Sequence, residues 1–257
     1  MPTPRNSYPI GNQQNRSHAS QTQAVRRPGV CAAAELTHSK KDKTNKDEEK
    51  EYVTIWLLSL ETGDARQLTA GLARDSNPQW SPDGQRIAFL STRGDKPQLY
   101  LILVHGGEAQ ALTAIKQGVG GGPVWSPDGK YIAFTAGPAT DPPQPNKPYR
   151  IARHIYRFDM VGYLDSAVQD VYVISIEEGG PKQLTDDNWQ NALPQWSPDG
   201  REILFIASMA PDSHTAFLGR LKAVNLEGEV RDITGDWALT QLSCYGRDLM
   251  SASWGCS

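Results

Sequence analysis

The chain has 257 residues, 38% of them hydrophobic and 21% charged, and its formal net charge is −3. Its longest apolar candidate, Val53–Leu60, is only strand-sized, so we expect no membrane span. A mildly acidic chain also argues against nucleic-acid binding, which needs a clustered basic surface. The cysteines (Cys31, Cys244 and Cys256) fit neither a disulfide framework nor a zinc site, which predicts a reducing, cytoplasmic location without metal or cofactor.

Residues 1–50 are predicted to form a disordered polar and charged tail. They are rich in Asn, Gln, Ser and Thr, and they end in the charge run Lys40–Lys50, which cannot bury an apolar face. Residues 1–34 contain four Arg and no acidic residue, as organellar transit peptides do. The apolar half of an amphipathic helix is missing, however, so this alternative is disfavoured.

From Glu51 the sequence changes to short β-like runs separated by turn residues, and we expect an incomplete β-propeller over residues 51–257. Tyr52–Leu60 is apolar and β-branched enough for a buried strand, and Ala65–Thr69 follows it after a turn. These two strands would be the second half of an opening blade.

The sequence W-S-P-D-G then occurs three times, each copy preceded by L-T and followed by an apolar run. In such a turn Pro presets φ, Asp bonds the local backbone and Gly supplies a positive φ. Repetition of this kind indicates stacked β-units. The repeat residues are Trp80, Asp83, Gly84, Trp125, Asp128, Gly129, Trp196, Asp199 and Gly200.

One full repeat is predicted to contain four strands. They are Pro78–Ser81, Gln85–Ser91, Gln98–Val104 and Ala109–Thr113. Trp125 lies 45 residues after Trp80, which matches a four-stranded propeller blade. Trp196 lies 71 residues after Trp125, so the next unit carries an insertion.

The insertion covers about residues 138–170. Five prolines begin it, an Arg- and Tyr-rich segment follows, and the blade resumes at Val171–Ile176. Loops of this length in compact domains are usually functional or disordered. Its arginines could bind a peptide carboxylate through two hydrogen bonds each, or pair with acids on neighbouring blades. The candidate substrate-facing residues are Arg150, Arg153, His154, Tyr156 and Arg157.

The last repeat continues through Ala216–Leu226 and Val230–Thr234, and a further unit begins and fails. Tyr245 stands where a tryptophan is due, and the following Ser, Pro and Asp are missing. We therefore predict an all-β chain of about three full blades plus two half blades. An open arc, or a ring completed by missing sequence, is favoured over a four-bladed ring.

Other roles for the repeat residues were weighed. The tryptophans could be ligand platforms, but packing between blades explains their period better. The turn aspartates lack the dense acidic spacing of a calcium loop. Gly118–Gly122 is followed by neither Lys-Ser/Thr nor a helix, so we interpret it as a turn and not a phosphate loop. No metal-ligand spacing relates His18, His38, His105, His154 and His214.

Two stretches, Ala73–Tyr100 and Ile151–Asp165, resemble the propeller of the prolyl oligopeptidase family, in particular its acylaminoacyl-peptidase-like branch. The W-S-P-D-G phrase alone is also shared with TolB-type propellers. In that peptidase family, an N-terminal propeller of usually seven blades caps an α/β-hydrolase domain that carries a Ser–Asp–His triad. The resemblance implies that the propeller filters substrates by size.

We expect no catalytic residue in this chain. It contains no G-x-S-x-G nucleophile elbow, and the nearest segment, Ser251–Gly255, has Ser where the first Gly belongs. The sequence thus predicts a truncated, substrate-gating propeller that is inactive alone. The alternatives are a TolB-like module that binds a protein or peptide, and a fragment that self-associates through exposed blade edges.

Overall fold

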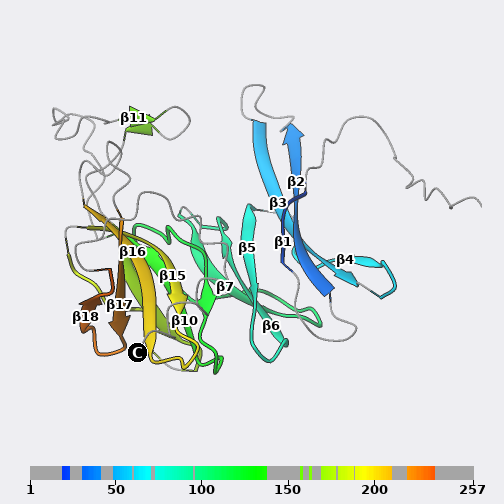
Figure 1. Ribbon diagram of the computed structural model, residues 1–257. Helices are drawn as coiled ribbons and strands as arrows, with labels where there is room; N and C mark the ends of the chain where they lie inside the picture. Colours follow the sequence, from blue (N-terminus) through cyan, green and yellow to red (C-terminus); the bar gives the residue numbers. More distant parts are fainter. Residues whose placement is uncertain are drawn as a thin grey trace, which may run out of the picture.

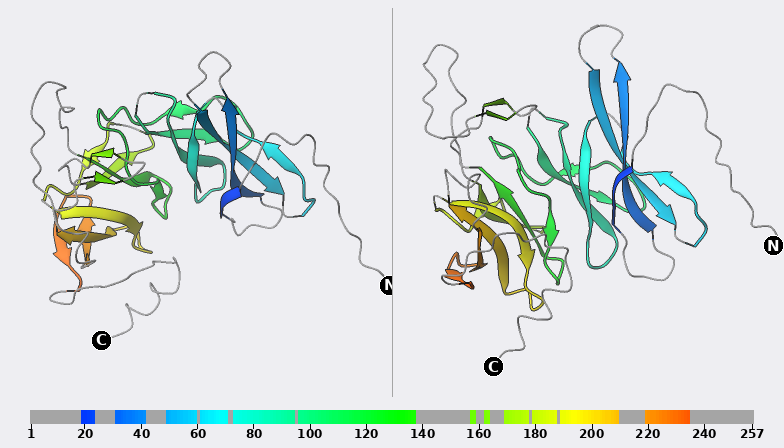
Figure 2. Two further views of the ribbon diagram at one scale, coloured as in Figure 1. Left: turned by 90° about the horizontal axis from the view of Figure 1, so that it is seen from above. Right: turned by 45° about the horizontal axis from the view of Figure 1, so that its top comes forward.

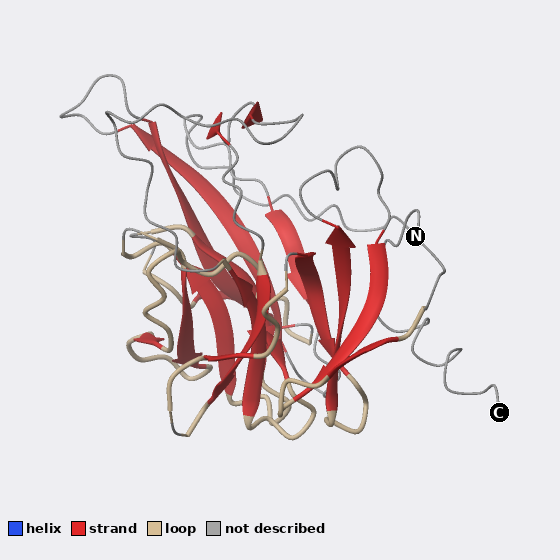
Figure 3. Cartoon of the chain, turned by 90° about the vertical axis from the view of Figure 1, so that its left-hand side faces the viewer, coloured by secondary structure: helices blue, strands red, loops and turns tan. Residues whose placement is uncertain are grey.

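The computed structural model is all-β. Strands and loops make up its described part, which contains neither a helix nor, therefore, any helix able to cross a bilayer (Figure 3). The structure describes residues 19–23, 31–41, 49–59, 61–70, 73–94, 96–137, 157–158, 162–163, 169–177, 179–187, 189–209 and 219–234.

Sixteen of the strands form four antiparallel sheets of four strands each. The first sheet contains β1 (Ala19–Gln23), β2 (Cys31–Lys41), β3 (Glu49–Ser59) and β4 (Ala65–Gln67). The second contains β5 (Asp75–Trp80), β6 (Arg86–Ser91), β7 (Gln98–Leu103) and β8 (Gln110–Ala111). The third contains β9 (Val124–Trp125), β10 (Tyr131–Ala136), β13 (Asp170–Ser175) and β14 (Lys182–Gln183). The fourth contains β15 (Trp189–Trp196), β16 (Glu202–Met209), β17 (Gly219–Asn225) and β18 (Val230–Asp232).

The sheets follow one another in chain order along a curved row (Figures 1 and 2). The first strand of each sheet contacts the first strand of the next, so β1, β5, β9 and β15 line the same side of the row. Each sheet is a meander of sequential strands, apart from a short pair, β11 (Arg157–Phe158) and β12 (Gly162–Tyr163), between β10 and β13. This is the blade arrangement of a partial propeller, which confirms the predicted fold class.

The first sheet corrects the expectation of a disordered tail at 1–50 and of an opening half blade. Strands β1 and β2 lie within that range, and β2 pairs with β3 from Cys31↔Ser59 to Lys41↔Glu49. The register of β1 shifts between Ala19 and Thr22, as β5 and β15 shift near their own starts. The physical reason is the ladder: the apolar β3 leaves a full row of backbone groups that needs a partner, whatever the composition of that partner. The expected closing half blade, after Thr234, lies outside the described residues.

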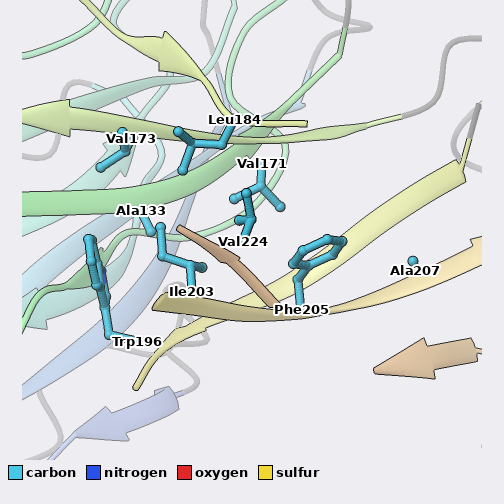
Figure 4. Packing of buried hydrophobic residues seen from close by; sticks show 9 residues of the cluster. All are labelled: Ala133, Val171, Val173, Leu184, Trp196, Ile203, Phe205, Ala207 and Val224. Carbon is cyan, nitrogen blue, oxygen red and sulfur yellow. The ribbon is translucent and has the colours of Figure 1, made fainter. Parts of the chain in front are cut away.

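Three hydrophobic clusters fill the junctions between successive sheets. At the junction of the third and fourth sheets, Ala133, Val171 and Val173 face Ile203 and Phe205 (Figure 4). The clusters at the other two junctions are built in the same way. Because side chains alternate along a strand, each inner sheet covers one neighbour with each of its faces. The core of the molecule is therefore the series of contacts between blades.

Candidate functional site at the insertion end of the sheets

The two ends of the sheets have different chemistry. The W-S-P-D-G turns join the first and second strands at one end, here called the turn end. At the opposite end, the insertion leaves β10 after Ala136 and returns before Asp170. This insertion end also holds the starts of β5, β13 and β15 and the ends of β6 and β16.

The turn end is closed by side chains that bond their own turn. Ser126 Oγ donates to Asp128 Oδ1 at 2.6 Å and accepts from the backbone N–H of Tyr131 at 3.0 Å. Asp128 Oδ1 also accepts from Lys130 N–H, and the Ser126 hydrogen bond is the main reason why the pKa of Asp128 is lowered. The same bonds recur at Ser81–Asp83 and Ser197–Asp199. The turn glycines, Gly84, Gly129 and Gly200, have φ of 70°, 73° and 70°.

The repeat tryptophans lie between sheets. Trp125 Nε1 donates to the backbone oxygen of Gln79 at 3.1 Å, and Trp196 Nε1 donates to that of Val124 at 3.1 Å. Trp80 packs against the cluster of the first junction, but its Nε1 is buried without a partner. These side chains join one blade to the preceding one, which leaves no open ring face as a ligand platform at Trp196, only 6% exposed.

At the insertion end, the threonine of each L-T pair bonds the third strand of its sheet. Thr113 Oγ1 accepts from Leu99 N–H at 2.9 Å and donates to Gln98 Oε1 at 2.8 Å. Sequence reasoning missed this role, although the fixed spacing of L-T before the tryptophan was its signal. The equivalent hydroxyls, which accept in the same way, are those of Thr69, Thr185 and Thr234.

Asp75 and Arg93 form an ion pair at the insertion end of the second sheet. Arg93 Nη2 lies 3.0 Å from Asp75 Oδ2, and the Asp75 side chain is fully buried. The guanidinium also covers the rings of Phe89 and Tyr100, at 5.6 and 5.2 Å from their centroids. Asp75 Oδ1 and the hydroxyl of Ser91, its neighbour across the ladder, are buried without partners. This corner therefore holds a buried carboxylate with only one oxygen paired.

A second buried carboxylate, Asp170, stands where the insertion returns. Burial raises its pKa, while hydrogen bonds from Thr185 and Asn191 and the charge of Asp187 modify that rise. Thr185 Oγ1 donates to Asp170 Oδ1 at 3.0 Å, and Gln183 Nε2 donates to Oδ2 at 3.1 Å. Asn191 Nδ2 joins Asp170 to Asp187, but its own Oδ1 is buried without a partner.

Cationic side chains flank this network on the fourth sheet. Lys222 Nζ lies 4.2 Å from the centroid of the Trp189 ring and 3.5 Å from Asp187 Oδ2. The guanidinium of Arg220 lies 5.7 Å from the same ring and pairs with Asp232. The insertion end thus combines fixed anions, cations on aromatic rings and unpaired acceptors, a set suited to the polar backbone and charged termini of a peptide.

The glycines at 118–122 pack tightly and form no phosphate loop. A Cβ on Gly120 would lie 2.0 Å from Gln169 Nε2, and one on Gly121 would lie 2.4 Å from Thr135 Oγ1. These contacts press the entry of the third sheet against β10 and against the residue that follows the insertion. Within the described ranges, no group of three His, Cys, Asp or Glu side chains could hold a metal ion.

Of the five predicted substrate-facing residues, only Arg157 lies among the described residues. It is in β11, where its backbone pairs with Tyr163. Arg150, Arg153, His154 and Tyr156 lie outside the described residues, so their substrate-facing role stays a prediction. His105 is exposed in a turn at the turn end, away from the carboxylates at the insertion end.

Residues 19–142 match the family model of the TolB beta propeller domain. The chain is 31% identical over 178 residues to a protein named "Uncharacterized peptidase YuxL" from Bacillus subtilis, which covers 66% of this chain and 27% of that protein. It is 37% identical over 59 residues to tricorn protease homolog 1 of Streptomyces coelicolor, 23% of this chain and 6% of that one.

Among solved structures, the Pyrococcus horikoshii acylaminoacyl peptidase matches 88% of this chain and 33% of its own, with a TM-score of 0.65 and 16% identity. A complex of an acylaminoacyl peptidase with Z-Gly-Gly-Phe-chloromethyl ketone gives a TM-score of 0.63, also at 16% identity, over 84% of this chain and 32% of that one. At these identities the likeness concerns the fold alone. The chain spans about a third or less of the peptidases that it matches.

Proposed function

We propose that this chain, which contains a TolB-type β-propeller domain, is the substrate-gating propeller of a serine peptidase of the acylaminoacyl-peptidase kind and does not hydrolyse peptides by itself. The observation that carries the proposal is the 31% identity to a peptidase over 178 residues. A match of that length includes the repeats and most of the blades, whereas the W-S-P-D-G phrase alone is common to many propellers.

The chemistry of the described hydroxyls supports the second half of the proposal. A nucleophilic serine needs a base in hydrogen-bond reach and an accessible oxygen. The repeat serines instead donate to a turn aspartate and accept a backbone N–H, as Ser126 does with Asp128 and Tyr131. They therefore serve as turn residues and have no hydroxyl proton left to give to a base.

The gating role is assigned to the insertion end. The insertion arises there, between β10 and β13, and its arginines would meet a peptide beside the carboxylate of Asp170. An arginine can hold the C-terminal carboxylate of a short peptide through two parallel hydrogen bonds. A folded substrate would be excluded by the same segment on size alone.

The activity half is tested with N-acetyl-aminoacyl p-nitroanilides and a fluorophosphonate probe of serine hydrolases. We expect neither turnover nor labelling of the purified chain. Turnover that disappears in Ser253→Ala would overturn the claim, because Ser253 occupies the segment closest to a nucleophile elbow. Turnover unaffected by that substitution and separable from the chain on a second column would mark a contaminating peptidase and leave the claim standing.

The gating half is tested by fluorescence anisotropy with a labelled N-acetylated tetrapeptide. We expect weak binding, with a dissociation constant below about 1 mM, that Arg153→Ala weakens at least about tenfold. Arg201→Ala is the matched control, because Arg201 is an exposed arginine at the turn end. Absence of binding up to about 1 mM, or equal losses in the two variants, would refute the assignment of the insertion end.

The match of residues 19–142 to the TolB beta propeller domain favours a second candidate, a module that binds a folded protein. Such a module would not respond to short peptides. Peptide binding that depends on Arg153 therefore supports gating, whereas capture of a folded partner without peptide binding supports the module.

A further inference from the structure

The two ends of the row of sheets each leave one sheet face without a described neighbour. Inside the row, every junction follows one rule: an aliphatic face of one sheet receives an aromatic-rich face of the next. Phe89 and Tyr100 of the second sheet meet Ile55 and Leu57 of the first. Phe134 and Tyr172 of the third sheet then meet aliphatic residues of the second, such as Leu99.

The outer face of the fourth sheet is of the aliphatic kind. Phe205 and Ile203 face the third sheet, so the residues that alternate with them in β16 point the other way. These are Leu204 and Ile206, whose ladder partners are Ala223 and Leu221. Leu204, Ile206 and Leu221 are half-buried, and they belong to none of the three clusters that the described residues form. Their positions correspond to Ala133, Thr135, Val171 and Val173 of the third sheet, which the fourth sheet covers.

The outer face of the first sheet is of the aromatic kind. Ile55 and Leu57 pack against the second sheet, so Trp56 and Leu58 point outward. Trp56 holds the position that Tyr100 and Tyr172 hold in the next two sheets, counted from the L-T threonine that bonds its neighbour. Its indole is half-buried and donates to Thr54 Oγ1, which fixes the ring in place.

We propose that the outer face of the fourth sheet receives the outer face of the first sheet of a second copy of this chain. The contact continues the rule of the existing junctions, since an aliphatic face meets an aromatic one. Each copy offers both faces, so two such contacts related by a two-fold axis would close a ring. The inference is independent of the proposed peptidase role, because it uses only the faces of the outer sheets.

The contact differs from the internal junctions in one respect. Internal junctions gain a hydrogen bond from Trp125 or Trp196, whereas the first sheet carries no W-S-P-D-G turn to donate one to the Gln195 oxygen. We therefore expect a reversible dimer, with a dissociation constant in the micromolar range, and not a permanent one.

The test is light scattering after size exclusion, with the full chain, from about 1 to 100 μM. Wild type should approach the mass of two chains at the upper end. Leu221→Glu places a charge on the aliphatic face and Trp56→Glu places one on the aromatic face, and each should weaken dimerisation at least about tenfold. Val230→Glu is the matched control: Val230 is an exposed apolar residue of the fourth sheet, paired with Val224, which faces the third sheet.

An equimolar mixture of the two variants separates this proposal from other contacts. In a head-to-tail contact, the intact fourth sheet of Trp56→Glu can still receive the intact first sheet of Leu221→Glu. The mixture should therefore form a two-chain species that neither variant forms alone. A wild type that stays monomeric, a Trp56→Glu variant that dimerises like wild type, or a mixture that fails to associate would overturn the proposal.

Folding is checked by thermal unfolding of each variant. If Leu221→Glu does not fold, Gln195→Arg replaces it, because Gln195 is an exposed residue on the same face, opposite Leu204. A long side chain there blocks the approach of a second sheet without entering the core. A monomeric wild type would refute the dimer and leave the gating proposal intact, since peptide binding at the insertion end does not require the outer faces.

Discussion

Replacing Trp80 and Trp125 by phenylalanine should have unequal effects on stability, although the two tryptophans hold equivalent positions. Both side chains are half-buried, and each packs against the cluster at its own junction. Trp125 Nε1 donates to the Gln79 oxygen at 3.1 Å, whereas Trp80 Nε1 is buried without a partner. The two sites therefore differ mainly in one hydrogen bond.

The magnitude follows from that difference. Loss of the larger ring is common to both substitutions and cancels in the comparison. Trp125→Phe also loses a hydrogen bond with a net value of about 1 kcal/mol, while Trp80→Phe removes a donor whose unpaired burial costs about 1–3 kcal/mol. We expect Trp125→Phe to be less stable than Trp80→Phe by about 2 kcal/mol or more, which for a chain of this size is a difference of roughly 4–8 °C in Tm.

Urea unfolding followed by far-UV circular dichroism measures the difference, and Trp196→Phe should behave like Trp125→Phe because its Nε1 also donates to a backbone oxygen. Equal free-energy losses in Trp80→Phe and Trp125→Phe, within about 0.5 kcal/mol, would refute the reasoning. That result would mean that the tryptophans stabilise the junctions through ring contacts alone.

Two further substitutions test other contacts. Gly121→Ala should destabilise the fold by about 1–3 kcal/mol, because the new Cβ would lie 2.4 Å from Thr135 Oγ1; Gly180→Ala, with nothing within 4 Å of its Cβ, should change the free energy of unfolding little, and equal effects would contradict this packing. Arg231 lowers the pKa of Glu202 through a hydrogen bond, so their pair stabilises the fold above the ordinary pKa of 4.5 and stops doing so as the pH falls through the lowered one. Arg231→Met should therefore cost less than about 1 kcal/mol at pH 7 and nothing at low pH, as urea titrations across pH would show, and a penalty that persists in acid would contradict the assignment.

Most of the fold could be predicted from the repeat alone. The spacing of the tryptophans predicted four strands to a blade, and β6, β7 and β13 begin within one residue of their predicted starts. The first two strands were not predictable in this way. β2 contains alanines and charged residues with little apolar alternation, and it is recognisable as a strand only once the long, apolar β3 is seen to need a partner along its whole length.

The candidate site was less accessible from sequence than the fold. Local motifs predicted the insertion, but the pairing of Asp75 with Arg93 spans a complete hairpin. The network around Asp170 and Asn191 likewise joins the third sheet to the start of the fourth. Such contacts depend on how the sheets stack, and no pattern in the neighbouring residues encodes them.

The position of the insertion also has a consequence for the order in which the blades form. In the second sheet, 6 residues separate β6 from β7, whereas 33 residues separate β10 from β13. Closing the longer loop costs about 1.5 kcal/mol more in chain entropy, since the cost grows with the logarithm of loop length. A chain emerging from the ribosome could complete its first two sheets early, while β10 waits for β13 and the fourth sheet waits for the third as a surface. Pulsed hydrogen exchange should accordingly protect the amides of β6 before those of β10.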